Sequence, residues 1–228
     1  TLDDFKNGEV ILIDKPLHWT SFQVVNKVRW LIRKTYNIKK IKVGHAGTLD
    51  PLATGLLVLC TGRMTKQIET FQAETKTYTG TITLGSTTPS YDLETEIDNT
   101  FPTDHITEEL INSTTKQFIG EIEQYPPVFS AIKKDGKRLY EFARAGQEVE
   151  IKPRKITINK FDIIKIEDNL LSFEVVCSKG TYIRSLAHDL GKVMHSGSHL
   201  SSLRRTKSGN FDVKDAFSIE DFERSITS

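Results

Sequence analysis

The stretch GHAGTLDPLATGLLVLC, residues 44–60, joins a loop of Gly, Thr and Pro to a short apolar run. The run LLVLC, residues 56–60, predicts a short, fully apolar strand. The loop before it carries a single carboxylate, Asp50. Residues 15–49 hold eight Lys or Arg and no Asp or Glu, so Asp50 stands alone at the edge of a basic segment. This isolation makes Asp50 the first residue to consider for chemistry.

The segments around this loop show both strand and helix periodicity. Residues 9–16 predict a strand that ends at a proline, and Thr20 or Ser21 can cap the helix that follows. Residues 76–85 alternate apolar and polar side chains, which is typical of a half-buried strand. Further elements are expected as a helix at 106–118, paired strands at 154–166 and 169–177, a helix entered through Gly180, and a last helix capped by Ser218.

Strands and helices mix without a regular βαβ repeat, which favours an α+β fold on a mixed, largely antiparallel sheet. No linker divides the chain, so residues 1–228 are expected to form one compact domain. Residues 126–155 combine basic residues, aromatics and Gly, and this composition predicts an exposed excursion from the core.

The composition bounds the class of protein. A chain of 228 residues with 37% hydrophobic content can bury a substantial core without disulfides or a structural metal. Cys60 and Cys177 lie in apolar runs, which favours buried thiols in a reducing compartment over a disulfide. No apolar run reaches the ~18–20 residues of a membrane span, and residues 1–10 lack the pattern of a signal peptide. We therefore expect a cytoplasmic protein without a metal site.

The charges are segregated along the chain, although the net charge is only +1. Residues 92–123 carry nine acidic residues and one lysine, whereas 126–155 and 176–208 are mainly basic, like 15–49. Three separate basic segments suit a folded polyanion, and they equally suit solvated helix faces. The charge pattern alone leaves both interpretations open.

Four roles for Asp50 can be compared by spacing. A phosphoaspartyl nucleophile of the D-x-D kind would need a second Asp where Leu52 stands, and a phosphate loop would need a Gly-Lys-Ser/Thr sequence that is missing. A metal site would need more ligands than His45. A turn cap before Pro51 and an oxygen nucleophile both stay open, the second because the glycines of the loop allow a ligand to approach closely.

Residues 44–59 closely resemble the catalytic motif of the TruB family of tRNA pseudouridine-55 synthases, which isomerise a T-loop uridine to pseudouridine. Further segments resemble other family motifs in the same order, so that the resemblance spans nearly the whole chain. They are DKPLHWTS at 14–21, KTY at 76–78, PPVFSAIKKDGKRLYEFAR at 126–144, CSKGTYIRSLAHDLG at 177–191 and LSSLRRTKSG at 200–209. The resemblance implies one pseudouridine-synthase catalytic domain whose sheet, helices and loops surround an RNA-binding cleft.

The resemblance implies a catalytic role for three residues. Asp50 would be the nucleophile that allows the N1–C1′ bond to break, so that the base turns and C5 bonds to C1′. Tyr78 would stack on the flipped base. Arg184 would pair with Asp50, since a neighbouring cation keeps a desolvated carboxylate ionised. No cofactor is implied, because the isomerisation involves no net redox change.

The resemblance also implies contacts with the T-arm of tRNA. His45 would stack in the RNA loop, and Lys15 with Pro16 would shape the pocket floor. Leu203, with Arg204 and Arg205, would line and flank the base pocket. Flipping a base costs a few kcal/mol, which a cationic surface and a pocket offset. The complete set of implied substrate-binding residues is Lys15, Pro16, His45, Gly47, Thr48, Asp92, Lys133, Arg138, Arg144, Leu203 and Arg204.

Residues 126–155 would form an insertion that closes over the T-arm when RNA binds. His18 stands where the family usually has Gly, and Ala46 where it more often has Thr, and both could alter loop geometry. We expect no PUA-like C-terminal domain, and a monomer that acts on tRNA without an obligate protein partner or a membrane. Two alternatives are an RNA-guided relative of the family and a module that folds tRNA without catalysis.

Overall fold

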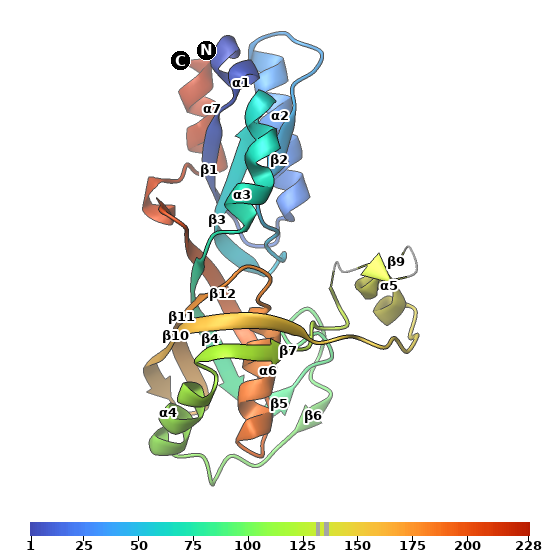
Figure 1. Cartoon of the computed structure of the whole chain (residues 1–228), viewed down its shortest axis with the longest axis vertical. Helices are drawn as coiled ribbons and strands as arrows, with labels where there is room; N and C mark the ends of the chain where they lie inside the picture. The colour runs from blue at the N-terminus through green and yellow to red at the C-terminus, as the bar shows by residue number, and fades with distance from the viewer. Residues whose placement is uncertain (131–132, 135–136) are drawn as a thin grey trace. The chain divides into compact units, whose positions relative to one another are not determined.

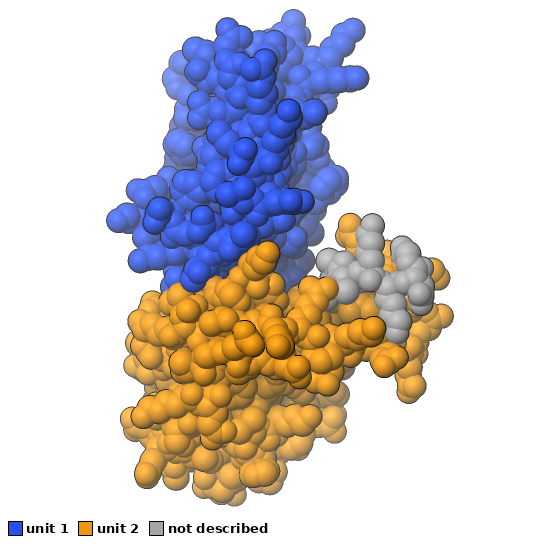
Figure 2. All heavy atoms as spheres, viewed as in Figure 1, with its two compact units in different colours: residues 1–78, 203–228 blue, residues 79–202 orange. Residues whose placement is uncertain are grey.

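The computed structural model describes three ranges of the chain, 1–130, 133–134 and 137–228. The chain forms two compact units, of which unit 1 comprises residues 1–78 and 203–228 and unit 2 comprises residues 79–202 (Figure 2). Strands β4 (Lys76–Leu84) and β12 (Ser198–Ser208) each begin in one unit and end in the other. Both boundaries therefore fall inside strands, which is why no linker marks them in the sequence. That the two units act as one catalytic domain stays a prediction.

Unit 1 is built on strand β3 (Ala53–Thr61), which contains the predicted apolar strand. β3 pairs antiparallel with β1 (Val10–Lys15) and β2 (Val43–His45), and parallel with β12. Both faces of β3 are covered. Leu57 and Leu59 pack into the core formed with helices α2 (Ser21–Thr35) and α7 (Ile219–Thr227), whereas Leu56 and Val58 pack with Ala46 and Phe71 on the other face. A strand buried on both faces accommodates only apolar side chains, which explains the run LLVLC.

Helices α2 and α7 cover one face of this sheet, and helix α3 (Ile68–Gln72), which carries Phe71, packs on the other (Figure 1). Helix α2 (Ser21–Thr35) begins as predicted, because Thr20 and Gln23 form a reciprocal capping box. Its buried side chains include Val24, Val28, Leu31 and Ile32, as the spacing predicts. The other elements of unit 1 are α1 (Leu2–Asn7), η1 (Gly62–Gln67), α3 (Ile68–Gln72), β13 (Phe211–Asp212), η2 (Val213–Asp215) and α7 (Ile219–Thr227).

Unit 2 contains the strands β4, β11 (Leu170–Cys177), β10 (Arg154–Glu167) and β7 (Gly120–Gln124), in that order. The predicted pairing of β10 with β11 is confirmed, with Ile158 opposite Cys177. Helix α4 (Glu108–Gln117) packs against β10. The remaining elements are β5 (Ser86–Thr87), β6 (Asn99–Thr100), β8 (Lys133–Lys134), β9 (Lys137–Arg138), α5 (Leu139–Arg144) and α6 (Ile183–Val193).

The predicted fold class is confirmed, since helices flank a mixed and largely antiparallel set of strands. Cys60 and Cys177 are both buried, and burial raises the pKa of the Cys60 thiol to about 11. Within the described ranges, no helix combines the length and the apolar character that a membrane crossing requires.

Candidate active site

The loop that carries Asp50 lies in unit 1 between β2 and β3, and its backbone is fixed by helix α2. The Ser21 hydroxyl donates to the carbonyl of Leu49 at 3.1 Å and accepts from the Leu49 N–H at 2.8 Å. The Ala53 N–H donates to the Asp50 carbonyl at 2.9 Å, which closes the turn into β3. Asp50 itself is half-buried. The fold thus holds this carboxylate on a rigid backbone at the start of the central strand.

A buried cation lies beside the same loop. The side chain of Lys15, at the end of β1, is fully buried. Its ammonium donates to the carbonyls of Pro16 at 2.9 Å, Trp19 at 2.5 Å and Pro51 at 3.4 Å. Burial lowers the pKa of Lys15 to about 8, and the charge of Asp50 acts in the opposite direction. Lys15 therefore supplies positive charge near Asp50 from within unit 1, a role that the sequence did not predict for it.

Arg205 binds the Asp50 loop to β3 from the other side. Its guanidinium is buried and donates to the carbonyls of Leu56 at 2.8 Å and Gly47 at 3.0 Å. Gly47 has a φ of 120°, which favours glycine, and an added Cβ would lie 3.4 Å from the guanidinium. Gly55 lets the strands approach, because a Cβ there would lie 2.2 Å from the Arg205 carbonyl. The sequence suggested that the glycines of this loop allow a ligand to approach. At Gly47 and Gly55, however, the group that approaches closely is the protein's own Arg205.

The neighbouring Arg204 faces away from Arg205, because successive side chains alternate along a strand. It forms a bidentate pair with Asp14, at 3.0 and 2.8 Å, and donates to the Thr54 hydroxyl at 3.3 Å. This pair is partly exposed. Arg204, predicted to flank the base pocket, is thus engaged with β1 and β3, and its contact with RNA stays a prediction.

The other predicted residues before Asp50 surround the loop. His45 ends β2, is half-buried, and has an Nδ1 without a hydrogen-bond partner among the described residues. Burial, and then the charge of Arg205, lower the pKa of His45. Thr48 is exposed and Pro16 is half-buried. These positions leave Thr48 accessible to a ligand from solvent.

Both departures from the family pattern have a local explanation. His18 has a φ of 69°, in the left-handed region that glycine adopts most readily, and its N–H donates to the Pro51 carbonyl at 2.8 Å. Ala46 is buried against Leu56 and Val58, where an apolar methyl group packs well. The chain therefore keeps the turn that usually has Gly, at the cost of some backbone strain at His18.

Two further predicted residues belong to unit 1. Tyr78, on β4, is almost fully buried. Leu203, on β12, is half-buried and pairs with Ala53 at the start of β3. Leu203 thus lies next to the strand end that follows the Asp50 loop.

Arg184 and Asp92 lie in unit 2 and organise one loop there. Arg184, on α6, is buried, and its Nη1 donates to the carbonyls of Phe129 at 2.7 Å and Ser90 at 3.2 Å. The buried carboxylate of Asp92 accepts from the Ser90 hydroxyl at 2.6 Å and the Glu94 N–H at 3.0 Å. The carboxylate of Asp92 is therefore engaged inside its own loop. The predicted pairing of Arg184 with Asp50 and contact of Asp92 with RNA stay predictions.

The predicted insertion contains a basic and aromatic cluster at the end of β9 and on α5. The guanidinium carbons of Arg138 and Arg144 lie 5.9 and 5.0 Å from the Tyr140 ring centre. Arg144 also approaches Glu94 at 3.5 Å. Lys133 belongs to β8, but its side chain lies outside the described residues. Closure of the insertion over RNA stays a prediction.

A basic groove of about 720 Å³ lies in unit 1 between the ends of α1 and α2 and the start of η1. β3 runs from the Asp50 loop toward this groove, and its nine residues at about 3.3 Å each separate the two by about 30 Å. No acidic residue lines the groove within the described chain. Its charged lining is Lys6, Arg29, Arg33, Lys39, Lys40, Lys42, Arg63 and Lys66.

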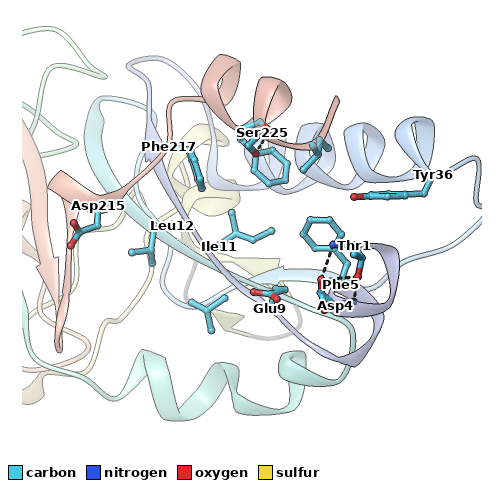
Figure 3. Close-up of a pocket in the computed structure, with 13 residues that line it drawn as sticks. Thr1, Asp4, Phe5, Glu9, Ile11, Leu12, Tyr36, Asp215, Phe217 and Ser225 are labelled. Carbon is cyan, nitrogen blue, oxygen red and sulfur yellow. Dashed lines mark hydrogen bonds and ion pairs between the residues drawn. The ribbon is translucent and has the colours of Figure 1, made fainter. Parts of the chain in front are cut away.

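A second hollow in unit 1, of about 420 Å³, lies between α1, β1 and α7 (Figure 3). Its lining is largely apolar near Phe217 and Phe222 and carries Asp4 and Glu9. None of the predicted site residues lines it. The basic groove, rather than this hollow, fits a polyanion.

Comparison with known proteins identifies the family. Residues 33–183 match the family described as TruB family pseudouridylate synthase (N terminal domain), and residues 184–228 match the tRNA pseudouridylate synthase B C-terminal domain. The chain belongs to the TruB family of pseudouridylate synthases. The motifs and periodicity of the sequence predicted one catalytic domain over residues 1–228 and did not separate residues 184–228 as a second match.

Two curated relatives match this chain over almost its whole length. Proteins named tRNA pseudouridine synthase B from Flavobacterium johnsoniae and Phocaeicola vulgatus are 63% and 55% identical over 99% and 96% of this chain, and the matches cover 99% and 93% of the relatives. A solved Cbf5-Nop10-Gar1 complex contains a similar chain, with a TM-score of 0.72, 29% identity and coverage of 98% of this chain and 56% of that chain. This chain thus spans about half the length of that solved relative.

Proposed function

We propose that this chain isomerises the T-loop uridine of tRNA to pseudouridine. The observation that carries the proposal is the presentation of Asp50: a single carboxylate on a loop held by Ser21 and Arg205, with the buried charge of Lys15 beside it. Relatives that are 63% and 55% identical bear the name tRNA pseudouridine synthase B, which supports tRNA as the substrate.

The chemistry follows from these side chains. Asp50 is the nucleophile, and a nearby cation keeps it ionised after water is displaced. Lys15 provides such a cation within unit 1, and Arg184 is proposed as a second one. Tyr78 stacks on the flipped uracil, which holds the base while it turns and C5 bonds to C1′. The fixed loop backbone places the nucleophile without reorganisation during the reaction.

The basic groove is proposed to hold the RNA backbone. Its eight cationic side chains repel one another until phosphates neutralise them. A groove about 30 Å from Asp50 can contact a helical stem while the loop nucleotide reacts. Arg138 and Arg144, beside Tyr140, are proposed as a further phosphate contact.

The first experiment replaces Asp50. Asp50→Asn keeps the side-chain volume and removes the nucleophile, so pseudouridine formation in an unmodified T-arm transcript should fall below detection while the Kd for RNA stays within about tenfold. Asp215→Asn, an exposed carboxylate in the same unit, is the matched control and should keep full activity. Substantial pseudouridine from Asp50→Asn would contradict the proposal.

One alternative has specific support, because a second solved relative belongs to an H/ACA RNP bound to a substrate RNA containing 2′-deoxyuridine. It has a TM-score of 0.69 and 28% identity, and the match covers 96% of this chain and 53% of that chain. We propose instead that this chain acts as a monomer on bare tRNA in the cytoplasm. Incubation of the purified chain with a tRNA transcript and no guide RNA separates the two, and a strict need for guide RNA or partner proteins would favour the alternative. Tight tRNA binding without any pseudouridine would favour a folding module.

A further inference from the structure

In unit 2, two residues that are not among the predicted site residues stack their aromatic rings on each other. The rings of Tyr91 and His188 have centroids 3.8 Å apart and planes inclined by 13°. Tyr91 belongs to the loop between β5 and β6, and His188 lies on α6. Both side chains are half-buried. Tyr91 adopts a φ of 67°, in the left-handed region that a bulky residue rarely occupies. Backbone strain of this kind persists where the surrounding structure requires the residue's position, so we infer a functional role for the contact between Tyr91 and His188.

The stack lies directly beside the contact between Arg184 and the same loop. His188 follows Arg184 by four positions on α6, so the two side chains share a face of the helix. Ser90 precedes Tyr91, and its carbonyl accepts from Arg184 Nη1 at 3.2 Å. Two successive loop residues therefore contact two successive turns of one helix.

The loop between these contacts is internally rigid. The Ser90 hydroxyl lies 2.6 Å from the Asp92 carboxylate and 2.7 Å from the Thr95 hydroxyl. The Tyr91 carbonyl accepts from the Leu200 N–H at 2.8 Å. A shift of the Tyr91 ring is therefore transmitted to the Ser90 carbonyl rather than absorbed between them. The position of the stack sets the position of an acceptor of Arg184.

The groups around the stack keep both rings neutral near pH 7. Burial, and then Lys192, lower the pKa of His188, while Asp98 acts in the opposite direction. Burial raises the pKa of Tyr91, and the charges of Asp189 and Asp98 raise it further. Neutral aromatic rings stack without the cost of a buried charge.

We propose that Tyr91 and His188 are positioning residues, which hold the Ser90 carbonyl so that the Arg184 guanidinium keeps its orientation. The inference rests on the proposed function in that Arg184 is taken to serve the isomerisation. It goes beyond that function by assigning a role to two side chains that are not among the predicted site residues.

The kinetic test uses single-turnover pseudouridine formation on a T-arm transcript. Tyr91→Ala and His188→Ala should lower the rate constant at saturating RNA by about three- to tenfold, as loss of one aromatic pair permits, and change the half-saturating concentration by less than about twofold. Tyr91→Phe keeps the ring and should restore the rate. His105→Ala is the matched control, because it removes a contact between His105 and the Met194 carbonyl at the other end of α6 and should leave the rate unchanged.

An Arg184→Lys background separates positioning from general loss of structure. If Tyr91 acts through Arg184, Tyr91→Ala should cause no further fall in a chain that already carries Arg184→Lys. Additive losses in the double variant, an unchanged rate in Tyr91→Ala, or a loss that Tyr91→Phe does not restore would each overturn the proposal.

A spectroscopic test does not depend on activity. The Nε–H resonance of Arg184, assigned by its disappearance in Arg184→Lys, should shift in Tyr91→Ala and His188→Ala and stay in place in Tyr91→Phe and His105→Ala. A resonance unmoved by Tyr91→Ala would overturn the positioning role. If the native chain made no pseudouridine, the proposed function would fail, and this measurement would still decide whether the stack orients Arg184.

Discussion

Two loops in this molecule, one in each unit, are held by the same device and differ in what else supports them. In unit 1 the buried Arg205 donates to the carbonyls of Gly47 and Leu56, and in unit 2 the buried Arg184 donates to those of Ser90 and Phe129. The Asp50 loop is also tied to a helix and to a fully buried strand. Besides Arg184, the loop that contains Ser90 depends on its internal network, on one backbone hydrogen bond from Leu200 and on one ring stack. The first loop is therefore built into the core, whereas the second can be adjusted by a single side chain.

The strongest test of this contrast is Arg205→Lys. A lysine cannot reproduce the planar fork that reaches two carbonyls, so buried acceptors lose their donor. We expect a fall of about 3 kcal/mol in the free energy of unfolding and of about a hundredfold in single-turnover rate. Urea denaturation and pseudouridine formation measure the two effects. Arg204→Lys is the neighbouring control for stability, since its partly exposed pair with Asp14 should contribute less than about 1 kcal/mol.

Ser21→Ala should weaken the Asp50 loop less severely. The change leaves the buried N–H and carbonyl of Leu49 without their partner, which costs about 1–3 kcal/mol. The rate should fall about tenfold as the loop loosens. Ser113→Ala removes an exposed hydroxyl contact with the Leu110 carbonyl and serves as control. Equal stability losses in both variants would show that the Asp50 loop does not depend on Ser21.

The pH dependence of the reaction should report the charge of Lys15. Its pKa is lowered to about 8, so it loses its proton above that pH and Asp50 loses a nearby cation. The rate should therefore fall as the pH rises above about 8. Stability moves the other way: the folded state carries the cost of a buried ammonium below pH 8 and is relieved of it between about 8 and the ordinary value of 10.5. In Lys15→Met, both the fall in rate above pH 8 and this rise in stability should disappear. If the fall in rate stayed unchanged, Lys15 would not be the group that causes it.

The smallest effect is expected at the basic groove, which β3 separates from the Asp50 loop within unit 1. Replacing Lys39 and Lys40 by Gln should weaken RNA binding a few fold and reduce the slope of log affinity against log salt by about 0.7–0.9 for each phosphate that is no longer neutralised. The rate at saturating RNA should not change. Lys165→Gln, an exposed lysine in unit 2, should leave the slope unaltered. A slope that stays the same in the groove variant would mean that RNA does not reach this surface.

The sequence predicted the elements well where periodicity and capping act locally. The strand around 56–60, the Thr20 cap and the pairing of β10 with β11 follow from apolar pattern and cap chemistry alone. The Asp50 loop was found because a lone carboxylate stands out in a basic run. Arg205 was expected beside the base pocket, but the part that Ser21 and Arg205 play in holding the Asp50 loop could not be predicted, because each depends on a partner far along the chain. Ser21 reads as an N-cap, and only the fold brings its hydroxyl to Leu49.

The contact of Arg205 with Gly47 joins residues 158 positions apart. A ribosome that adds about 5–20 residues per second needs roughly 8–30 s to make the chain between them. During that interval the growing chain already exposes the Asp50 loop and the apolar strand β3, but neither Arg205 nor the neighbouring strand β12 exists to complete them. The nucleophile is therefore held in its final position only after Arg205 has been made and has reached Gly47. A nascent chain of this protein has to keep β3 from aggregating before it can act on RNA.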